Sequence, residues 1–173
     1  MDSLYEGRGN TAIFSPCRRW RYILTRTWDP TKGICVMIGL NPSTADETED
    51  DPTIRRCKRF AKDWGYGGIY MVNAFALRAT DPKVMLAAGA NAVGPRNNEY
   101  LLEVGRVAEI AVACWGAHGH HLGRQHDIRR MYAGAMLNLY ALGFTKDGLP
   151  LHPLYLRADT LPKLWPIPAP VAA

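Results

Sequence analysis

The sequence alternates short apolar runs with longer amphipathic segments, and this order limits the possible folds more than any other feature. Three runs have the length and continuous apolarity of strands that are buried on both faces: 34–40 (ICVMIGL), 68–75 (GIYMVNAF) and 110–116 (IAVACWG). Because parallel strands need long crossover connections, strands separated by helices favour a parallel sheet with helices on both faces. The order therefore predicts a three-layer α/β/α sandwich with a mostly parallel central sheet.

Segments with helical periodicity lie between or after these runs, at 51–65, 95–109 and 124–143. The first has clear end signals, since Asp51 can cap it, Pro52 suits its first position and Gly65 can end it. The third is predicted to be one long helix.

The remaining segments give weaker signals. Residues 18–28 alternate with a period of two, which predicts a strand with one solvent-facing side. A short strand is expected near 142–145, and the proline-rich tail 159–173 is expected to be extended. The 173 residues suit a single domain (1–173), with its core at about 11–158.

Composition narrows the class of protein. The chain is 47% hydrophobic and 21% charged, with a net charge of +5 that favours an anionic partner. It lacks a membrane-length apolar run and the pattern of a secretory signal, so we expect a cytoplasmic protein without membrane contact. The four scattered cysteines form no CxxC pair, which favours reduced, structural thiols.

Polar residues follow the predicted strands. Ligands of parallel α/β sheets bind beyond the carboxyl ends of the strands. The residues expected there are Asn41, Asn73, Trp115, Gly116, His118 and His152. Their order in the chain predicts a polar cluster along one edge of the sheet.

The motifs that carry these residues support two resemblances. GLNPS (39–43), VNAF (72–75), ACWGAHG (113–119) and HPLYL (152–156) resemble, in order and context, the motifs of the uracil-DNA glycosylase superfamily. Residues 18–158 resemble more closely the bacterial and phage family called domain of unknown function 1643. Segments that fit this family include DPTIRRC, WGYGG and VNAFALRATDP.

The glycosylase resemblance implies a glycosylase-like fold and a role for several residues. His152 would donate a hydrogen bond to a base oxygen as negative charge develops on the leaving base, and Asn73 would bind the base edge. Asn41 would hold a water or the anomeric face of the sugar at attack distance, and Phe75 or a nearby aromatic residue would stack on the extruded base. The residues expected to shape the rest of the pocket are Gly39, Pro42, Ser43, Trp115, Gly116 and His118.

The chain also departs from the glycosylase pattern. His-Pro-Leu stands where those proteins have His-Pro-Ser, Ser43 stands where they have glycine, and Arg157 is the nearest residue that could act as a wedge. Each candidate also has a structural interpretation: Asn41 as the start of an Asx-turn, Asn73 as a strand-end cap, and His152 as a loop histidine bonded to backbone.

The acids that follow Asn41 need their own explanation. Asp50 and Asp51 suit the positive end of the following helix, whereas Asp46, Glu47 and Glu49 do not. Asp46 is the candidate to activate water or to bind a divalent ion. The histidine-rich loop 118–121 resembles a metal site but lacks an evident carboxylate partner, so we expect neither a metal nor a cofactor.

Three functions remain open from the sequence. The first is a glycosylase-like hydrolase that cleaves an N-glycosidic bond in DNA or in a nucleotide, in DNA repair or modification. The second is a non-catalytic module that binds a modified base or nucleotide. The third is a metal-dependent phosphoesterase or nuclease. All three have nucleic acid, a nucleotide or a nucleobase as partner.

Overall fold

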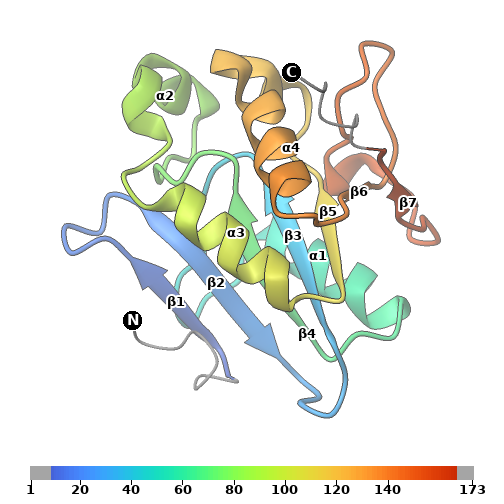
Figure 1. Cartoon of the computed structure of the whole chain (residues 1–173). Helices are drawn as coiled ribbons and strands as arrows, with labels where there is room; N and C mark the ends of the chain where they lie inside the picture. The colour runs from blue at the N-terminus through green and yellow to red at the C-terminus, as the bar shows by residue number, and fades with distance from the viewer. Residues whose placement is uncertain (1–8, 167–173) are drawn as a thin grey trace.

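A computed structural model describes residues 9–166, which form a seven-stranded sheet with helices on both faces (Figure 1). The strands are β1 (Thr11–Phe14), β2 (Arg21–Thr27), β3 (Ile34–Gly39), β4 (Gly68–Asn73), β5 (Ile110–Ala113), β6 (Tyr140–Ala141) and β7 (Lys163–Leu164). The α-helices are α1 (Pro52–Asp63), α2 (Pro82–Ala87), α3 (Asn97–Val107) and α4 (Arg124–Gly134). Three 3₁₀ segments are η1 (Gly89–Ala92), η2 (Ala117–Gly123) and η3 (Pro153–Tyr155).

The sheet is mixed, which corrects the expectation of a mostly parallel one. Its strand order is β1-β2-β4-β3-β5-β6-β7. Strands β4, β3, β5 and β6 are parallel to one another, whereas β1, β2 and β7 pair antiparallel with their neighbours. The physical reason at the β1–β2 side is the short connection 15–20, which can join antiparallel neighbours but cannot form a crossover.

Alternate residues of the central strands supply two separate cores. Val36 and Ile38 of β3 face the core that includes residues of α2, α3 and α4, whereas Cys35 and Met37 face the core that includes residues of α1. Figure 1 shows α3 and α4 in front of the sheet and α1 behind it. The continuous apolarity of β3 is thereby explained, because both of its faces are covered.

Several predicted elements are confirmed. The three apolar runs form β3, β4 and β5, and the first helical segment forms α1. Asp51 is its N-cap, since its side chain accepts a hydrogen bond from the Ile54 amide at 2.8 Å. The second helical segment forms α3. Cys35 and Cys114 are buried free thiols, as expected.

Two predictions are wrong in detail. The long helix 124–143 ends at Gly134, because Met136 takes a positive φ of 56° and turns the chain so that Tyr140–Ala141 pairs with β5. The strand in 18–28 has no solvent-facing side within residues 21–26, because Arg21 and Arg26 are both buried. Residues 167–173 of the predicted extended tail lie outside the described residues.

Within residues 9–166 no helix has both the length and the apolarity required to cross a bilayer.

Candidate functional site

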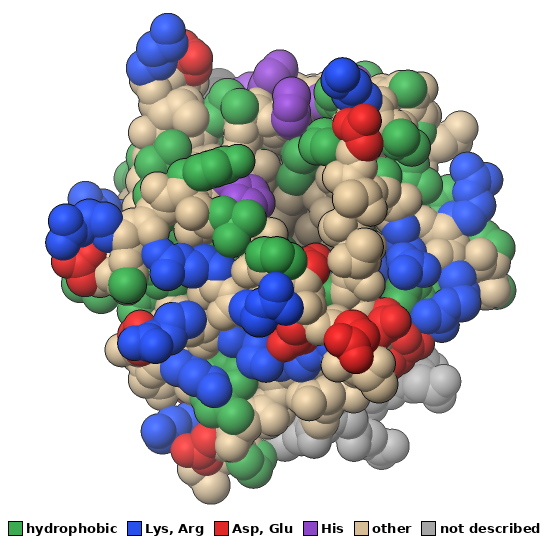
Figure 2. Space-filling view, turned by 180° about the vertical axis from the view of Figure 1, so that it is seen from behind, with side chains coloured by type: hydrophobic (Ala, Val, Ile, Leu, Met, Phe, Trp, Pro, Cys, Tyr) green, Lys and Arg blue, Asp and Glu red, His purple; other side chains and the backbone are tan. Residues whose placement is uncertain are grey.

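A cavity of about 560 Å³ lies at the carboxyl ends of β3, β4 and β5. The ends of these strands line it together with the beginning of α1 and the segment 152–155. Figure 2 views the molecule from the side opposite to Figure 1, and shows histidine side chains beside a hollow in the surface. On this side Lys and Arg side chains gather below the hollow, with acidic side chains beside them.

The structure brings most of the predicted site residues to this cavity. The lining includes Gly39, Asn41, Ser43, Asn73, Trp115, Gly116, His118 and His152. Pro42, Asp46 and Phe75 are not part of the lining. Phe75 is fully buried in the core beside His121, where it cannot stack on a bound base.

Asn41 has a structural role as well as a place in the cavity wall. Its Nδ2 donates to the carbonyl oxygens of Pro42 (3.2 Å), Leu77 (3.4 Å) and Ala79 (2.9 Å). The amide nitrogen is therefore committed to holding the segment after β4 against the Asn-Pro turn. Its Oδ1 is the atom that remains to accept a hydrogen bond from a water or a ligand.

Asn73 ends β4 and is 2% exposed. Its Oδ1 lies 3.5 Å from Nη2 of Arg21, and its main-chain oxygen accepts from Nδ2 of Asn97 at 2.9 Å. Gly39 leaves space for it, because a Cβ at that position would lie 2.9 Å from Asn73 Nδ2. Since a guanidinium only donates, Asn73 turns its oxygen toward Arg21, and Nδ2 is left to donate to a ligand.

His152 precedes η3, and its ring is held by the backbone. Its Nδ1 accepts from the Leu154 amide at 3.3 Å, so the neutral ring carries its proton on Nε2. Burial lowers the pKa of His152, and the negative charge of Asp51 partly opposes this shift. At neutral pH the ring is therefore an uncharged donor through Nε2.

Trp115 and Gly116 close the end of β5. Trp115 is 1% exposed, and the η2 loop passes so close that a Cβ on Gly119 would lie 1.9 Å from Trp115 Cδ1. Gly116 takes a φ of 75°, which a glycine adopts without strain. These residues give the cavity an apolar wall whose shape depends on glycine.

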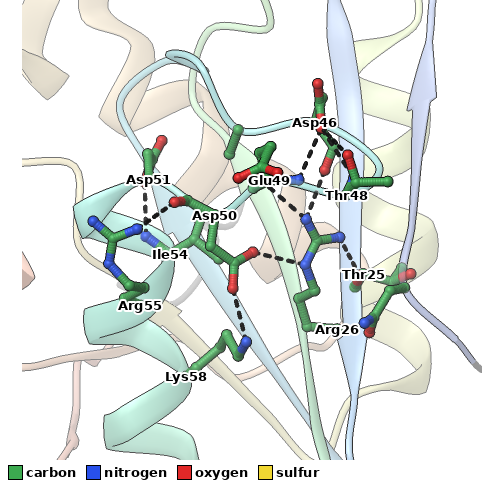
Figure 3. A network of polar contacts seen from close by, with 12 residues as sticks. Thr25, Arg26, Asp46, Thr48, Glu49, Asp50, Asp51, Ile54, Arg55 and Lys58 are labelled. Atoms are coloured by element: carbon green, nitrogen blue, oxygen red, sulfur yellow. Dashed lines mark hydrogen bonds and ion pairs between the residues drawn. The ribbon is translucent and has the colours of Figure 1, made fainter.

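The acids after Asn41 have partners within the protein (Figure 3). Asp50 pairs with Arg26 and Lys58, each at 2.7 Å. Asp46 Oδ1 accepts from the amides of Thr48 and Glu49, each at 2.9 Å, and these hydrogen bonds lower the pKa of Asp46. Glu47 pairs with Arg18. The acids thus shape the loop, and the predicted water activation by Asp46 has no support from its position.

Several lining residues were not among the candidates derived from the sequence: Arg21, Thr53, Thr80 and Tyr155. Asp51 was identified as a helix cap but not as part of the cavity wall. Arg21 reaches the cavity from β2, and its alternation with apolar residues suggested a solvated side chain instead. Tyr155 is 86% exposed at the mouth and lies 5.7 Å, between ring centroids, from His152.

The histidine-rich loop does not assemble a metal site with the acids. No group of three or more His, Cys, Asp or Glu side chains is placed to hold a metal ion within residues 9–166. Hydrogen bonds and ion pairs engage the acidic loop instead, so the geometry gives the phosphoesterase alternative no support.

Comparison with known proteins identifies the family to which the chain belongs. A family model described as "Protein of unknown function (DUF1643)" matches residues 21–154, which is more than half of the chain. No curated protein matches the chain. No solved structure matches it. The comparisons support the closer of the two resemblances and leave the glycosylase one as a proposal.

Proposed function

The chain belongs to the DUF1643 family, and on this premise we propose that its cavity binds a nucleobase and hydrolyses the N-glycosidic bond that joins it to a sugar. One observation carries the proposal: Asn41, Asn73 and His152, which lie far apart in the sequence, line the same cavity. The volume of about 560 Å³ is in the range of small-molecule sites.

The hydrogen-bonding groups suit the departure of a base. Asn73 Nδ2 and His152 Nε2 are donors, and cleavage of the bond develops negative charge on the leaving base. The departing base accepts a hydrogen bond from Nε2 of the neutral His152, and it takes up the proton that the attacking water loses when its oxygen bonds to the sugar. Asn41 Oδ1 accepts from the attacking water and positions it, while Trp115 forms an apolar wall for the ring.

Asp51 is the described residue whose carboxylate lines the cavity, whereas Asp46, which the sequence made the candidate to activate water or to bind a divalent ion, does not line it. Asp51 Oδ1 is committed to the cap of α1, while Oδ2 has no hydrogen-bond partner among the described residues. Asp51 Oδ2 is therefore the candidate to stabilise positive charge on the sugar.

The test is a gel assay with oligonucleotides that contain uracil, hypoxanthine or xanthine, with and without EDTA. We expect an abasic product that persists in EDTA and falls by about 100-fold or more in His152→Gln, as for loss of an acid–base or oxyanion group. His126→Gln is the matched control, because His126 is exposed on α4 and outside the cavity lining. Product formation that is unchanged in His152→Gln would refute the assignment.

A second candidate function is a binding module that recognises a base without cleaving it. It is favoured by the hydrogen bonds of Asn41, because Nδ2 contacts three backbone carbonyl oxygens and thereby holds the structure of the cavity wall. Tight binding of one base without product in the same assay would support this function. Strand scission that EDTA abolishes would instead support a nuclease.

A further inference from the structure

Arg21 is a buried cation without an ion-pair partner. The residue is 2% exposed, and none of the ion pairs among the described residues includes it. Nη1 donates to the Ala45 carbonyl at 2.7 Å, and Nη2 has one long contact of 3.5 Å to Asn73 Oδ1. Its buried Nε finds no acceptor within residues 9–166. A buried guanidinium in this state is destabilising, because no ion pair offsets the loss of its hydration.

Arg26, on the same strand, has the ion pair and the hydrogen bonds that usually accompany a buried arginine. It is as buried as Arg21, but Asp50 accepts from its Nε at 2.7 Å and backbone carbonyls accept from both of its terminal nitrogens. Burial lowers the pKa of Arg21 to about 10, so that it still carries its charge at neutral pH. The two arginines differ because a carboxylate pairs directly with Arg26, whereas no anion pairs directly with Arg21.

The missing anion has a place to bind, because Arg21 lines the cavity. Of the described residues, it is the one Lys or Arg in the lining. It lies beside Asn73, whose Nδ2 is free to donate, so this corner of the cavity presents donors. Asp51 also lines the cavity, and its negative charge acts on Arg21, although no ion pair joins the two side chains.

We propose that the corner formed by Arg21 and Asn73 is an anion site, which binds the negatively charged edge of a flat ligand. The ligand class is an ionised oxo-substituted heterocycle or a heterocyclic carboxylate. The inference that the ligand has a flat ring depends on the proposed function, whereas the inference that it is negatively charged depends on Arg21 itself. A ligand anion here supplies the acceptors that Nη2 lacks, and it forms the direct ion pair that no described residue makes with Arg21.

The test is calorimetric titration of the full chain with orotate and with orotamide, which have the same ring but differ in charge. We expect orotate to bind about tenfold more tightly or better, as for a hydrogen bond to a buried charge. Equal affinities would overturn the inference. This comparison uses the wild-type chain, so that it does not depend on the folding of a variant.

Arg21→Met should abolish the preference for orotate while circular dichroism shows an unchanged fold. Arg124→Met is the matched control: Arg124 is also buried, but it donates to Ala74 and Asn98 and lies outside the cavity lining. We expect this control to keep the preference. A preference that persists in Arg21→Met would overturn the inference.

Inorganic phosphate separates this inference from the proposed function. If phosphate binds and depends on Arg21 but neither ring compound binds, the anion site holds and nucleobase recognition fails. If the oligonucleotides are cleaved but orotate has no advantage over orotamide, the proposed function holds and the anion site fails. If orotate and phosphate both fail to bind, the anion site is refuted, and the oligonucleotide assay decides the function separately.

Discussion

Removal of the Asp50 carboxylate tests how the acidic loop is held. Asp50 accepts from Nε of Arg26 and from Nζ of Lys58, each at 2.7 Å, and the side chains of Arg26 and Asp50 are 3% and 16% exposed. Loss of one partner of a buried pair costs about 3–5 kcal/mol because a buried charge is left unpaired. Arg26 keeps its contacts with the carbonyls of Thr25 and Asp46. We therefore expect the lower end, about 3 kcal/mol, for Asp50→Ala.

The assay is urea unfolding followed by circular dichroism, with the free energy of unfolding extrapolated to water. Asp63→Ala is the matched control, because its pair with Arg59 is exposed, at 39% and 67%, and should contribute less than about 1 kcal/mol. Adding Arg26→Met to Asp50→Ala should restore part of the stability, since it removes the unpaired charge. The reasoning is refuted if Asp50→Ala costs no more than Asp63→Ala, or if the double variant is less stable than Asp50→Ala alone.

The ion pairs of Asp50 also predict that the stability of the protein depends on pH. Burial opposes ionisation of Asp50, but hydrogen bonds from Lys58 and Arg26 outweigh it and lower the pKa of Asp50. The stabilisation is therefore complete above the unfolded-state value of about 3.9 and is lost as the pH falls through the folded-state pKa. The difference in unfolding free energy between the wild type and Asp50→Ala should narrow in that acid range. A difference that stays constant down to complete protonation would contradict this assignment.

Three further predictions concern the cavity wall. By NMR titration, the pKa of His152 should lie below 6.5, and it should fall further in Asp51→Asn because Asp51 opposes the shift caused by burial; a rise would contradict the proximity of the two groups. Asp51→Ala should lower the free energy of unfolding by about 1 kcal/mol through loss of the cap, whereas Asp51→Asn should cost much less, and equal losses in urea unfolding would argue against the cap. Gly119→Ala should cost about 1–3 kcal/mol by forcing Trp115 to move, while Gly134→Ala, which has open space around it, should be neutral or stabilising in the same assay.

Where the determining contacts are local, the sequence was sufficient. The apolar runs predicted β3, β4 and β5, because a strand covered on both faces must be apolar throughout. The Asp-Pro pair predicted the start of α1, because a cap involves residues three apart in the chain. In parallel strands the carboxyl ends meet at one edge, so Asn41 and Asn73 were expected to lie together, and both line the cavity.

The end of α4 depended on distant residues. Helical periodicity continues past Gly134, yet the chain turns there so that Leu139 enters the core and Ala141 pairs with Ala113 of β5. The free energy of these contacts comes from the rest of the fold, and a window on the sequence does not contain it.

Arg21 shows most clearly what the tertiary structure decided. Strand β2 runs antiparallel to β4, so that the beginning of β2 lies at the edge where β4 ends, and the Arg21 amide donates to the Ala76 carbonyl. The sequence placed Asn41, Asn73 and His152 at the predicted edge through the rule for parallel strands. The same rule did not predict that Arg21 lies at this edge, because the position of an antiparallel strand depends on the neighbour with which it pairs. That pairing is determined by the packing of the whole sheet.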